Sequence, residues 1–138
     1  IIQVDRNAMD VCFGCYRQLF NENWKFTYDF DELAAAYASY QTTMSHWEKL
    51  IPSFLIRVSY EELIRNFDKS VSDIISFCGL EHEVACLNPH ENQRVVTTLS
   101  ATQVRQPVFR SGINRWRVYE EHLTPLQKAL TNHGFNYQ

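Results

Sequence analysis

The clearest chemical feature of the chain is a block of arginines around the segment Gln103–Trp116, which reads QVRQPVFRSGINRW. No acidic residue lies between Glu91 and Glu120, although the whole chain is acidic, with 13 Lys and Arg against 16 Asp and Glu and a formal charge of -3. A guanidinium offers a planar fork of N–H donors to an oxyanion, so the block is a candidate phosphate or sulfate receptor. The alternative is a basic face that contacts only solvent. The block consists of Arg94, Arg105, Arg110, Arg115 and Arg117.

Another arginine, Arg6, stands where one hydrophobic pattern changes into another. The apolar run Ile1–Val4 suits a buried strand, and from Ala8 the apolar residues repeat with the period of a helix. Asn7 is the expected N-cap of that helix, and Asp10 suits its positive end. Arg6 is therefore expected at the edge where open parallel sheets bind ligands, with an ion pair across the sheet as the alternative role. The expected apolar face of the helix holds Val11, Cys12, Cys15 and Leu19.

The rest of the pattern predicts helices and one further strand. The apolar run Phe54–Val58 is expected, like Ile1–Val4, to be a strand of a parallel sheet that is buried on both faces. Asp29 with Glu32 resembles a capping box that opens a long helix over about Asp31–Leu50. The core stripe of this helix is expected to hold Leu33, Ala36, Tyr37, Tyr40, Met44 and Trp47. The other expected elements are a short turn or helix from Glu61, a helix capped by Asp68 and ended at Gly79, a loop over Leu87–Arg94 and a last helix from Thr124 to Gly134.

Three segments together resemble sulfotransferases that use 3'-phosphoadenosine 5'-phosphosulfate (PAPS). They are the strand, Arg6 and helix at the start of the chain, RVSYEELIRN (Arg57–Asn66), and SATQVRQPVFRSGINRW (Ser100–Trp116). Their order and spacing are similar to those of bacterial sulfotransferases, including forms fused to tetratricopeptide repeats, and of tyrosylprotein sulfotransferases. The resemblance covers essentially the whole chain.

This resemblance implies an α/β fold, with a parallel sheet like that of P-loop NTPases flanked by helices. Residues 1–138 would form a single domain that holds only the C-terminal, mostly helical part of the fold and is incomplete at its N-terminus. Two strands do not make a stable buried parallel sheet, so further strands are expected from an upstream part of the same domain; the alternatives are that they were lost or come from another chain. Tetratricopeptide repeats are one option for what precedes them.

The resemblance also assigns roles to individual residues. Arg6 would bind the 3'-phosphate of the cofactor, and Gly14 stands where the family normally has a serine that also binds this phosphate. Tyr60 matches a tyrosine that contacts the adenine, and Ser100 matches a serine near the nucleotide. Arg115 matches a basic residue that reaches the cofactor phosphate. Arg110, with Ser111 and Gly112, resembles an Arg-Lys-Gly element of the cytosolic enzymes.

By this resemblance, the protein would transfer a sulfuryl group from PAPS to an acceptor hydroxyl or amine and release 3',5'-adenosine bisphosphate. The chain would hold the adenine and 3'-phosphate half of the cofactor site. The phosphosulfate loop and the catalytic base of the family lie upstream of Arg6, so the isolated chain is expected to be inactive. Two alternatives are a non-catalytic nucleotide- or oxyanion-binding module, which Gly14 favours, and a nucleic-acid-binding domain that uses Arg94–Arg117. The acidic net charge argues against a nucleic-acid partner.

The cysteines and the hydropathy pattern bear on the compartment. Cys12 and Cys15 have the CxxC spacing of zinc and redox sites, but Cys78 and Cys86 do not form a second close pair. Buried free thiols are the preferred interpretation, which predicts no metal and a reducing cytoplasm. No apolar run is long enough to span a membrane, so no membrane partner is expected.

Overall fold

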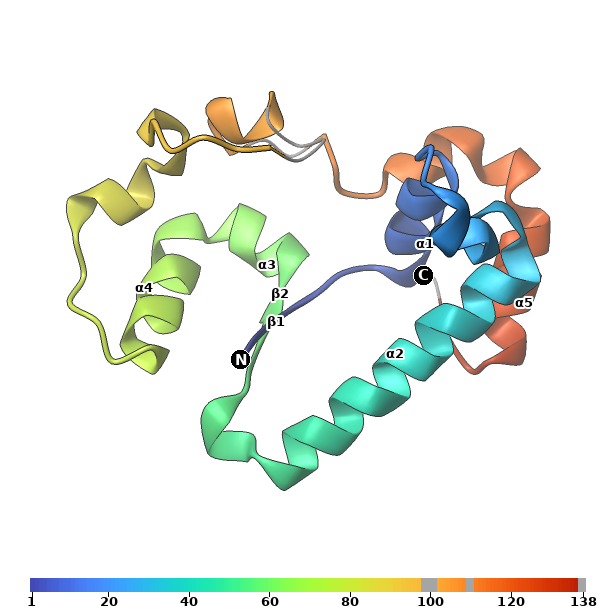
Figure 1. Ribbon diagram of the computed structural model, residues 1–138, viewed down its shortest axis with the longest axis horizontal. Helices are drawn as coiled ribbons and strands as arrows, with labels where there is room; N and C mark the ends of the chain where they lie inside the picture. Colours follow the sequence, from blue (N-terminus) through green and yellow to red (C-terminus); the bar gives the residue numbers. More distant parts are fainter. Residues whose placement is uncertain (98–101, 109–110, 137–138) are drawn as a thin grey trace. The chain divides into compact units, whose positions relative to one another are not determined.

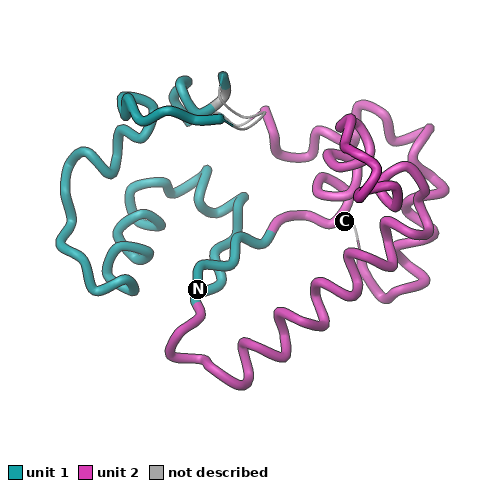
Figure 2. The backbone as a smooth tube through the Cα atoms, viewed as in Figure 1, with its two compact units in different colours: residues 1–5, 56–110 teal, residues 6–55, 111–138 magenta. Residues whose placement is uncertain are grey.

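The computed structural model describes residues 1–97, 102–108 and 111–136. The chain divides into two compact units, drawn in different colours in Figure 2. Unit 1 comprises residues 1–5 and 56–110, and unit 2 comprises residues 6–55 and 111–138. Each unit therefore takes segments from distant parts of the sequence.

The centre of unit 1 is a sheet of two parallel strands, β1 (Ile2–Asp5) and β2 (Ile56–Ser59). Ile2 pairs with Ile56 and Asp5 with Ser59, which confirms the two predicted strands and their parallel sheet and shows that they are direct neighbours. The second strand begins at Ile56 rather than Phe54, because Pro52–Phe54 forms a 3-10 helix, whose first position proline favours.

Burial of the sheet differs from the prediction. Val58 is buried, but Ile2 is 45% exposed and Val4 is 50% exposed, so the described sheet is not covered on both faces. A strand that is hydrogen-bonded on one side leaves its other edge, and the side chains next to it, without a neighbouring strand.

Two helices of unit 1 follow the second strand, α3 (Tyr60–Arg65) and α4 (Phe67–Phe77), and both pack against it. Ser59 caps α3 by accepting the Glu62 N–H at 3.2 Å. The predicted cap of α4 is wrong, because Asn66 occupies the N-cap position and Asp68 lies in the first turn. Gly79 follows this helix with a φ of 69°, a left-handed conformation that favours glycine. The rest of the described part of unit 1 includes 3-10 helices at Val84–Leu87, Pro89–Glu91 and Gln103–Arg105, of which the first two fall in or beside the predicted loop.

Unit 2 is a helical assembly of α1 (Ala8–Tyr16), α2 (Phe30–Leu50) and α5 (Thr124–Asn132), which pack against one another (Figure 1). Two 3-10 helices, Glu22–Tyr28 and Arg115–His122, complete it. The hydrophobic core draws on all of these helices and includes Met9, Cys12, Phe13, Leu33, Ala34, Trp116, Leu126 and Leu130.

Local caps set the starts of α1 and α2, as the sequence predicts. The Asn7 side chain accepts the N–H groups of Met9 and Asp10, which satisfies donors that have no partner inside the helix. The Asp29 side chain accepts N–H groups in the same way from Asp31 and Glu32.

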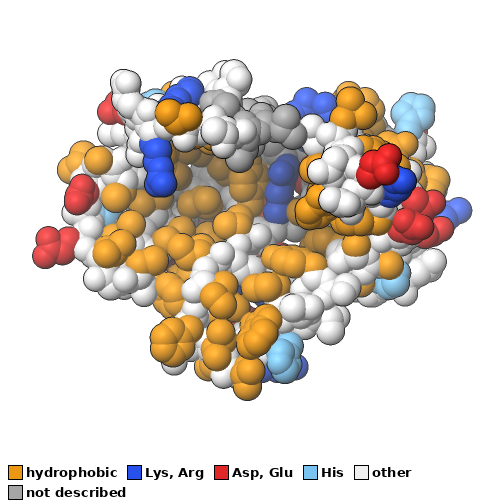
Figure 3. All heavy atoms as spheres, in the orientation of Figure 1, with side chains coloured by type: hydrophobic (Ala, Val, Ile, Leu, Met, Phe, Trp, Pro, Cys, Tyr) orange, Lys and Arg blue, Asp and Glu red, His pale blue; other side chains and the backbone are white. Residues whose placement is uncertain are grey.

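The predicted apolar faces of these helices are only partly correct. Leu19 is 86% exposed, because α1 ends at Tyr16. Along α2, Leu33 is buried, whereas Tyr40 and Trp47 are each 41% exposed. Hydrophobic side chains gather at the surface over the carboxyl end of α2 and the 3-10 helix that follows it (Figure 3). The period of the helix therefore predicts the stripe, but not how far along the stripe the core extends.

Candidate functional site

Arg6 joins the start of α1 to a segment more than a hundred residues later. It lies between β1 and α1, as predicted, and its Nη2 donates a hydrogen bond to the carbonyl oxygen of Gly112. Its side chain is 28% exposed, so an anion in solution can still reach the guanidinium. Arg6 thus connects two of the segments that the sequence proposed for one site.

Asp10 makes the strongest link between these segments. Its Oδ2 accepts the N–H of Asn114 at 2.7 Å, and its Oδ1 accepts the N–H of Trp116 at 3.1 Å. The same Oδ2 lies 3.8 Å from Nη2 of Arg6, and the Asp10 side chain is only 1% exposed. The sequence assigned Asp10 only a favourable place near the helix terminus; the four-residue spacing from Arg6 was the one signal of this ion pair.

Arg115 lies between the two residues that Asp10 holds. Asn114 has a φ of 56°, a left-handed conformation that asparagine tolerates, and Arg115 begins the 3-10 helix Arg115–His122. Trp116 is 1% exposed and anchors this helix in the core of unit 2. Unit 2 therefore brings Arg6 together with the backbone that carries Gly112 and Arg115.

Gly14 lies in the last turn of α1 and is exposed. A Cβ atom added there would meet no atom within 4 Å, so neither crowding nor backbone conformation requires a glycine. A serine would fit at this position.

The other proposed site residues belong to unit 1. Tyr60 is the first residue of α3 and directly follows β2. A small cavity of about 170 Å³ between β2, α3 and α4 is lined by Arg57, Ser59 and Glu62 among others, but not by Tyr60. Ser100 and Arg110 lie outside the described residues.

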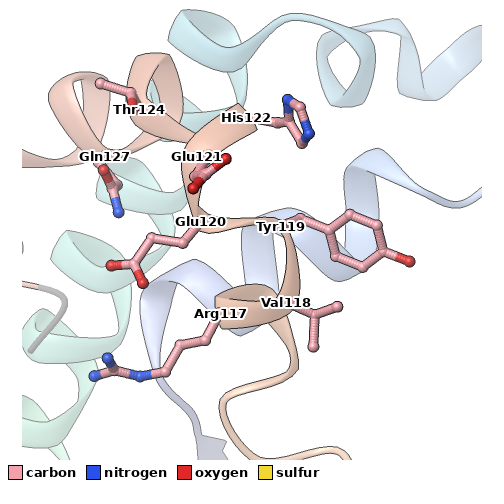
Figure 4. A pocket seen from close by; sticks show the side chains of 8 residues that line it. All are labelled: Arg117, Val118, Tyr119, Glu120, Glu121, His122, Thr124 and Gln127. Atoms are coloured by element: carbon pink, nitrogen blue, oxygen red, sulfur yellow. The ribbon is translucent and has the colours of Figure 1, made fainter.

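A shallow depression of about 520 Å³ lies on unit 2 beside the 3-10 helix Arg115–His122 and the start of α5 (Figure 4). The side chains of Glu120 and Gln127 point to one side of this region, whereas Val118 and Tyr119 point to the other. Two carboxylates, from Glu120 and Glu121, line it. Arg117 also lines it, but the two carboxylates outweigh its single positive charge, so this depression is a poor phosphate receptor.

The four cysteines are free thiols. Cys12 is buried, and burial, with a smaller effect from the neighbouring Cys15, raises the pKa of its thiol to about 12. Burial also raises the pKa of Cys15, which is partly exposed. Such thiols are largely protonated at neutral pH, which does not favour nucleophilic or metal-binding roles. Within the described residues, no three His, Cys, Asp or Glu side chains form a group that could hold a metal ion. No helix in the same residues has the length and apolar character to span a membrane.

Comparisons with known proteins support the sulfotransferase family as such. The family model described as "Sulfotransferase family" matches residues 1–84, the part that holds Arg6, Gly14 and Tyr60. A protein of Aquifex aeolicus (strain VF5), described as an uncharacterized protein, is 30% identical over 133 residues. The match covers 94% of this chain and 18% of that protein, so the chain spans less than a fifth of the relative's length. No solved structure matches. Because the family model covers more than half of its residues, the chain belongs to the sulfotransferase family.

Proposed function

We propose that this chain forms the part of a PAPS-dependent sulfotransferase that binds the 3'-phosphate and the adenine of the nucleotide. Family membership supports sulfuryl transfer in general. The observation that carries the cofactor assignment is the bond from Arg6 to Gly112, which joins the strand–helix junction to the segment of Arg115. Two guanidiniums on a fixed backbone suit an oxyanion, because each presents a planar set of N–H donors to it.

In this proposal, three residues of unit 2 bind the 3'-phosphate. Arg6 donates to the 3'-phosphate from the edge of β1, where its side chain remains partly exposed. Arg115 adds a second positive charge, and its main chain is held because Asp10 binds the N–H groups on both sides of it. Ser111, which is exposed next to Gly112, is a further proposed ligand.

The remaining assignments rest on the family resemblance. Tyr60 contacts the adenine, and Ser100 and Arg110 lie near the nucleotide. The likeness to bacterial and tyrosylprotein sulfotransferases, the P-loop-like sheet and the upstream segments that would complete it are proposals of the same kind.

Bound PAPS supplies an activated sulfuryl group, and the acceptor is a hydroxyl or an amine. The residues of this chain bind and orient the nucleotide and place positive charge near its phosphate. None of them is assigned as the base that takes the acceptor proton. The isolated chain is therefore proposed to bind nucleotide without catalysing transfer.

The test is calorimetric titration of the full-length protein with 3',5'-adenosine bisphosphate and with AMP, which lacks the 3'-phosphate. The wild type is expected to prefer the bisphosphate. Arg6→Ala or Arg115→Ala is expected to weaken bisphosphate binding by about ten- to a hundredfold, the value of a charge-assisted hydrogen bond, with little effect on AMP.

Arg65→Ala is the matched control, because Arg65 is an exposed arginine in the last turn of α3. Its nucleotide affinities should equal those of the wild type. Equal affinity of the wild type for the bisphosphate and AMP would overturn the cofactor assignment.

A non-catalytic nucleotide-binding module is the second candidate function, and Gly14 favours it, because the chain lacks the serine hydroxyl of the family at this position. This candidate predicts that the full-length protein prefers the bisphosphate but transfers no sulfuryl group from labelled PAPS to a panel of phenol, alcohol and amine acceptors.

A further inference from the structure

We propose that Asp10 is the positioning residue of this anion site, since one buried carboxylate holds both the Arg6 side chain and the main chain around Arg115. This inference rests on the proposed function, in which Arg6 and Arg115 receive the phosphate. It adds a residue that does not touch the ligand but sets the geometry of two residues that do.

The hydrogen-bond geometry requires a carboxylate at this position. Oδ2 of Asp10 accepts the Asn114 N–H at 2.7 Å, and Oδ1 accepts the Trp116 N–H at 3.1 Å. An ionised carboxylate accepts hydrogen bonds at both oxygens, whereas an asparagine would turn an NH2 group towards one of these N–H donors. An asparagine would therefore lose one of the two hydrogen bonds, and its NH2 group would face a main-chain N–H, so that two donors would oppose each other.

Burial shows that Asp10 acts through other groups. Its side chain is 1% exposed, and the main chain of Asn114–Trp116 is bound to its oxygens. A phosphate would also be repelled by its charge. The partly exposed guanidinium of Arg6, 3.8 Å from Oδ2, is the group that a ligand can reach.

The result is a site with its geometry set before the ligand binds. Nη2 of Arg6 has two partners, the carboxylate of Asp10 and the carbonyl of Gly112. Arg115 is held through its two neighbours, one of which, Asn114, has a left-handed backbone. Fixing groups in their binding conformation lowers the entropy lost on binding, so the benefit should appear in phosphate affinity.

The first test needs no substitution. Amide hydrogen exchange of the wild-type protein without nucleotide should find the Asn114 and Trp116 amides protected, since both are bound to Asp10 before any ligand arrives. Rapid exchange of both amides in the free protein would overturn the inference.

The second test replaces the charge with a group of nearly the same shape. Asp10→Asn should weaken binding of 3',5'-adenosine bisphosphate by about tenfold or more, the value of a lost charge-assisted contact, and change AMP affinity by less than about threefold. A role confined to folding would lower both affinities by the same factor. Asp31→Asn is the matched control, because Asp31 lies in the first turn of another helix, α2, and is exposed.

The outcomes separate this inference from the proposed function. If the wild type prefers the bisphosphate and Asp10→Asn keeps the same preference, Asp10 does not position the site and the proposed function stands. If the wild type binds the bisphosphate and AMP equally, the proposed function fails and this inference fails with it. In an Arg6→Ala background, Asp10→Asn should cost less bisphosphate affinity than in the wild type, because part of its effect passes through Arg6.

Discussion

A few residues carry the chemistry of the candidate site. Some of them can be recognised from the sequence, and others cannot. Arg115 could be selected from the sequence because it lies in an arginine block without carboxylates, and Arg6 because it lies where a strand changes into a helix. Asp10 could not be selected, because an aspartate near a helix start is common. Its significance comes from Asn114 and Trp116, which lie 104 and 106 residues away in the sequence.

The buried Cys12 thiol predicts a pH dependence of stability. Its pKa is raised to about 12 in the folded protein by burial and, to a smaller extent, by Cys15, from an ordinary value of 9.0. Between these values the folded state keeps a proton that the unfolded state loses. The contribution of Cys12 to the free energy of unfolding is therefore fully present below the lower pKa. It falls as the pH rises above that value, by at most about 1.4 kcal/mol per pH unit.

Urea unfolding at about pH 8 and about pH 10 measures this effect, with values chosen on either side of the unfolded pKa. Cys12→Ala should lose less free energy of unfolding between the two conditions than the wild type. Cys78→Ala is the control, because Cys78 is exposed, and it should retain the wild-type loss. An unchanged pH response in Cys12→Ala would contradict the prediction.

At the scale of elements, the starts of α1 and α2 were predictable, whereas the cap of α4 and the buried faces of the helices were not. Asn7 and Asp29 cap α1 and α2 through bonds to amides two and three residues away, so the relevant information is local in the sequence. The start of β2 depended on a competing turn at Pro52. The exposure of Tyr40 and Trp47 on α2 depends on where neighbouring helices end, which no local pattern contains.

Gly14 gives a prediction for α1. Gly14→Ser should raise the free energy of unfolding by about 0.5 kcal/mol, because serine has the higher helix propensity and a Cβ atom meets nothing within 4 Å. Under the proposed function, the added hydroxyl should also raise bisphosphate affinity by about three- to tenfold, the value of one hydrogen bond. Chemical denaturation and calorimetric titration measure the two effects.

Gly134→Ser is the matched control, since Gly134 has a φ of 84° that a serine adopts only with strain. It should lower stability and leave the ratio of bisphosphate to AMP affinity unchanged. A loss of bisphosphate affinity in Gly14→Ser would count against a phosphate ligand at this position.

At the scale of the whole molecule, the hydrophobic core is unevenly distributed between the units. The buried cluster that includes Met9, Leu126 and Leu130 belongs to unit 2. Among the described residues of unit 1, Val58 is the one hydrophobic residue that is buried, and the sheet there has two strands. Two strands alone make a marginal sheet, so unit 1 should open more readily than unit 2.

Native-state hydrogen exchange of the 138-residue chain tests this expectation. Amides of α1 and α5 should exchange more slowly than those of β2 and α4, because opening the first two helices exposes the main core. Equal protection of β2 and α1 would contradict it. A longer form of the protein that increases protection in β2 would support the proposal that further strands complete the sheet.

The sequence alone determined the features that depend on near neighbours or on residue type. These are the two short apolar runs as strands of a parallel sheet, the caps of α1 and α2, the position of Arg6 between a strand and a helix, and the family resemblance later supported by the match over residues 1–84. The tertiary structure decided which distant groups meet. It placed the Gly112 carbonyl on Arg6 and the amides around Arg115 on Asp10, because a buried charge must find its partners wherever folding brings them.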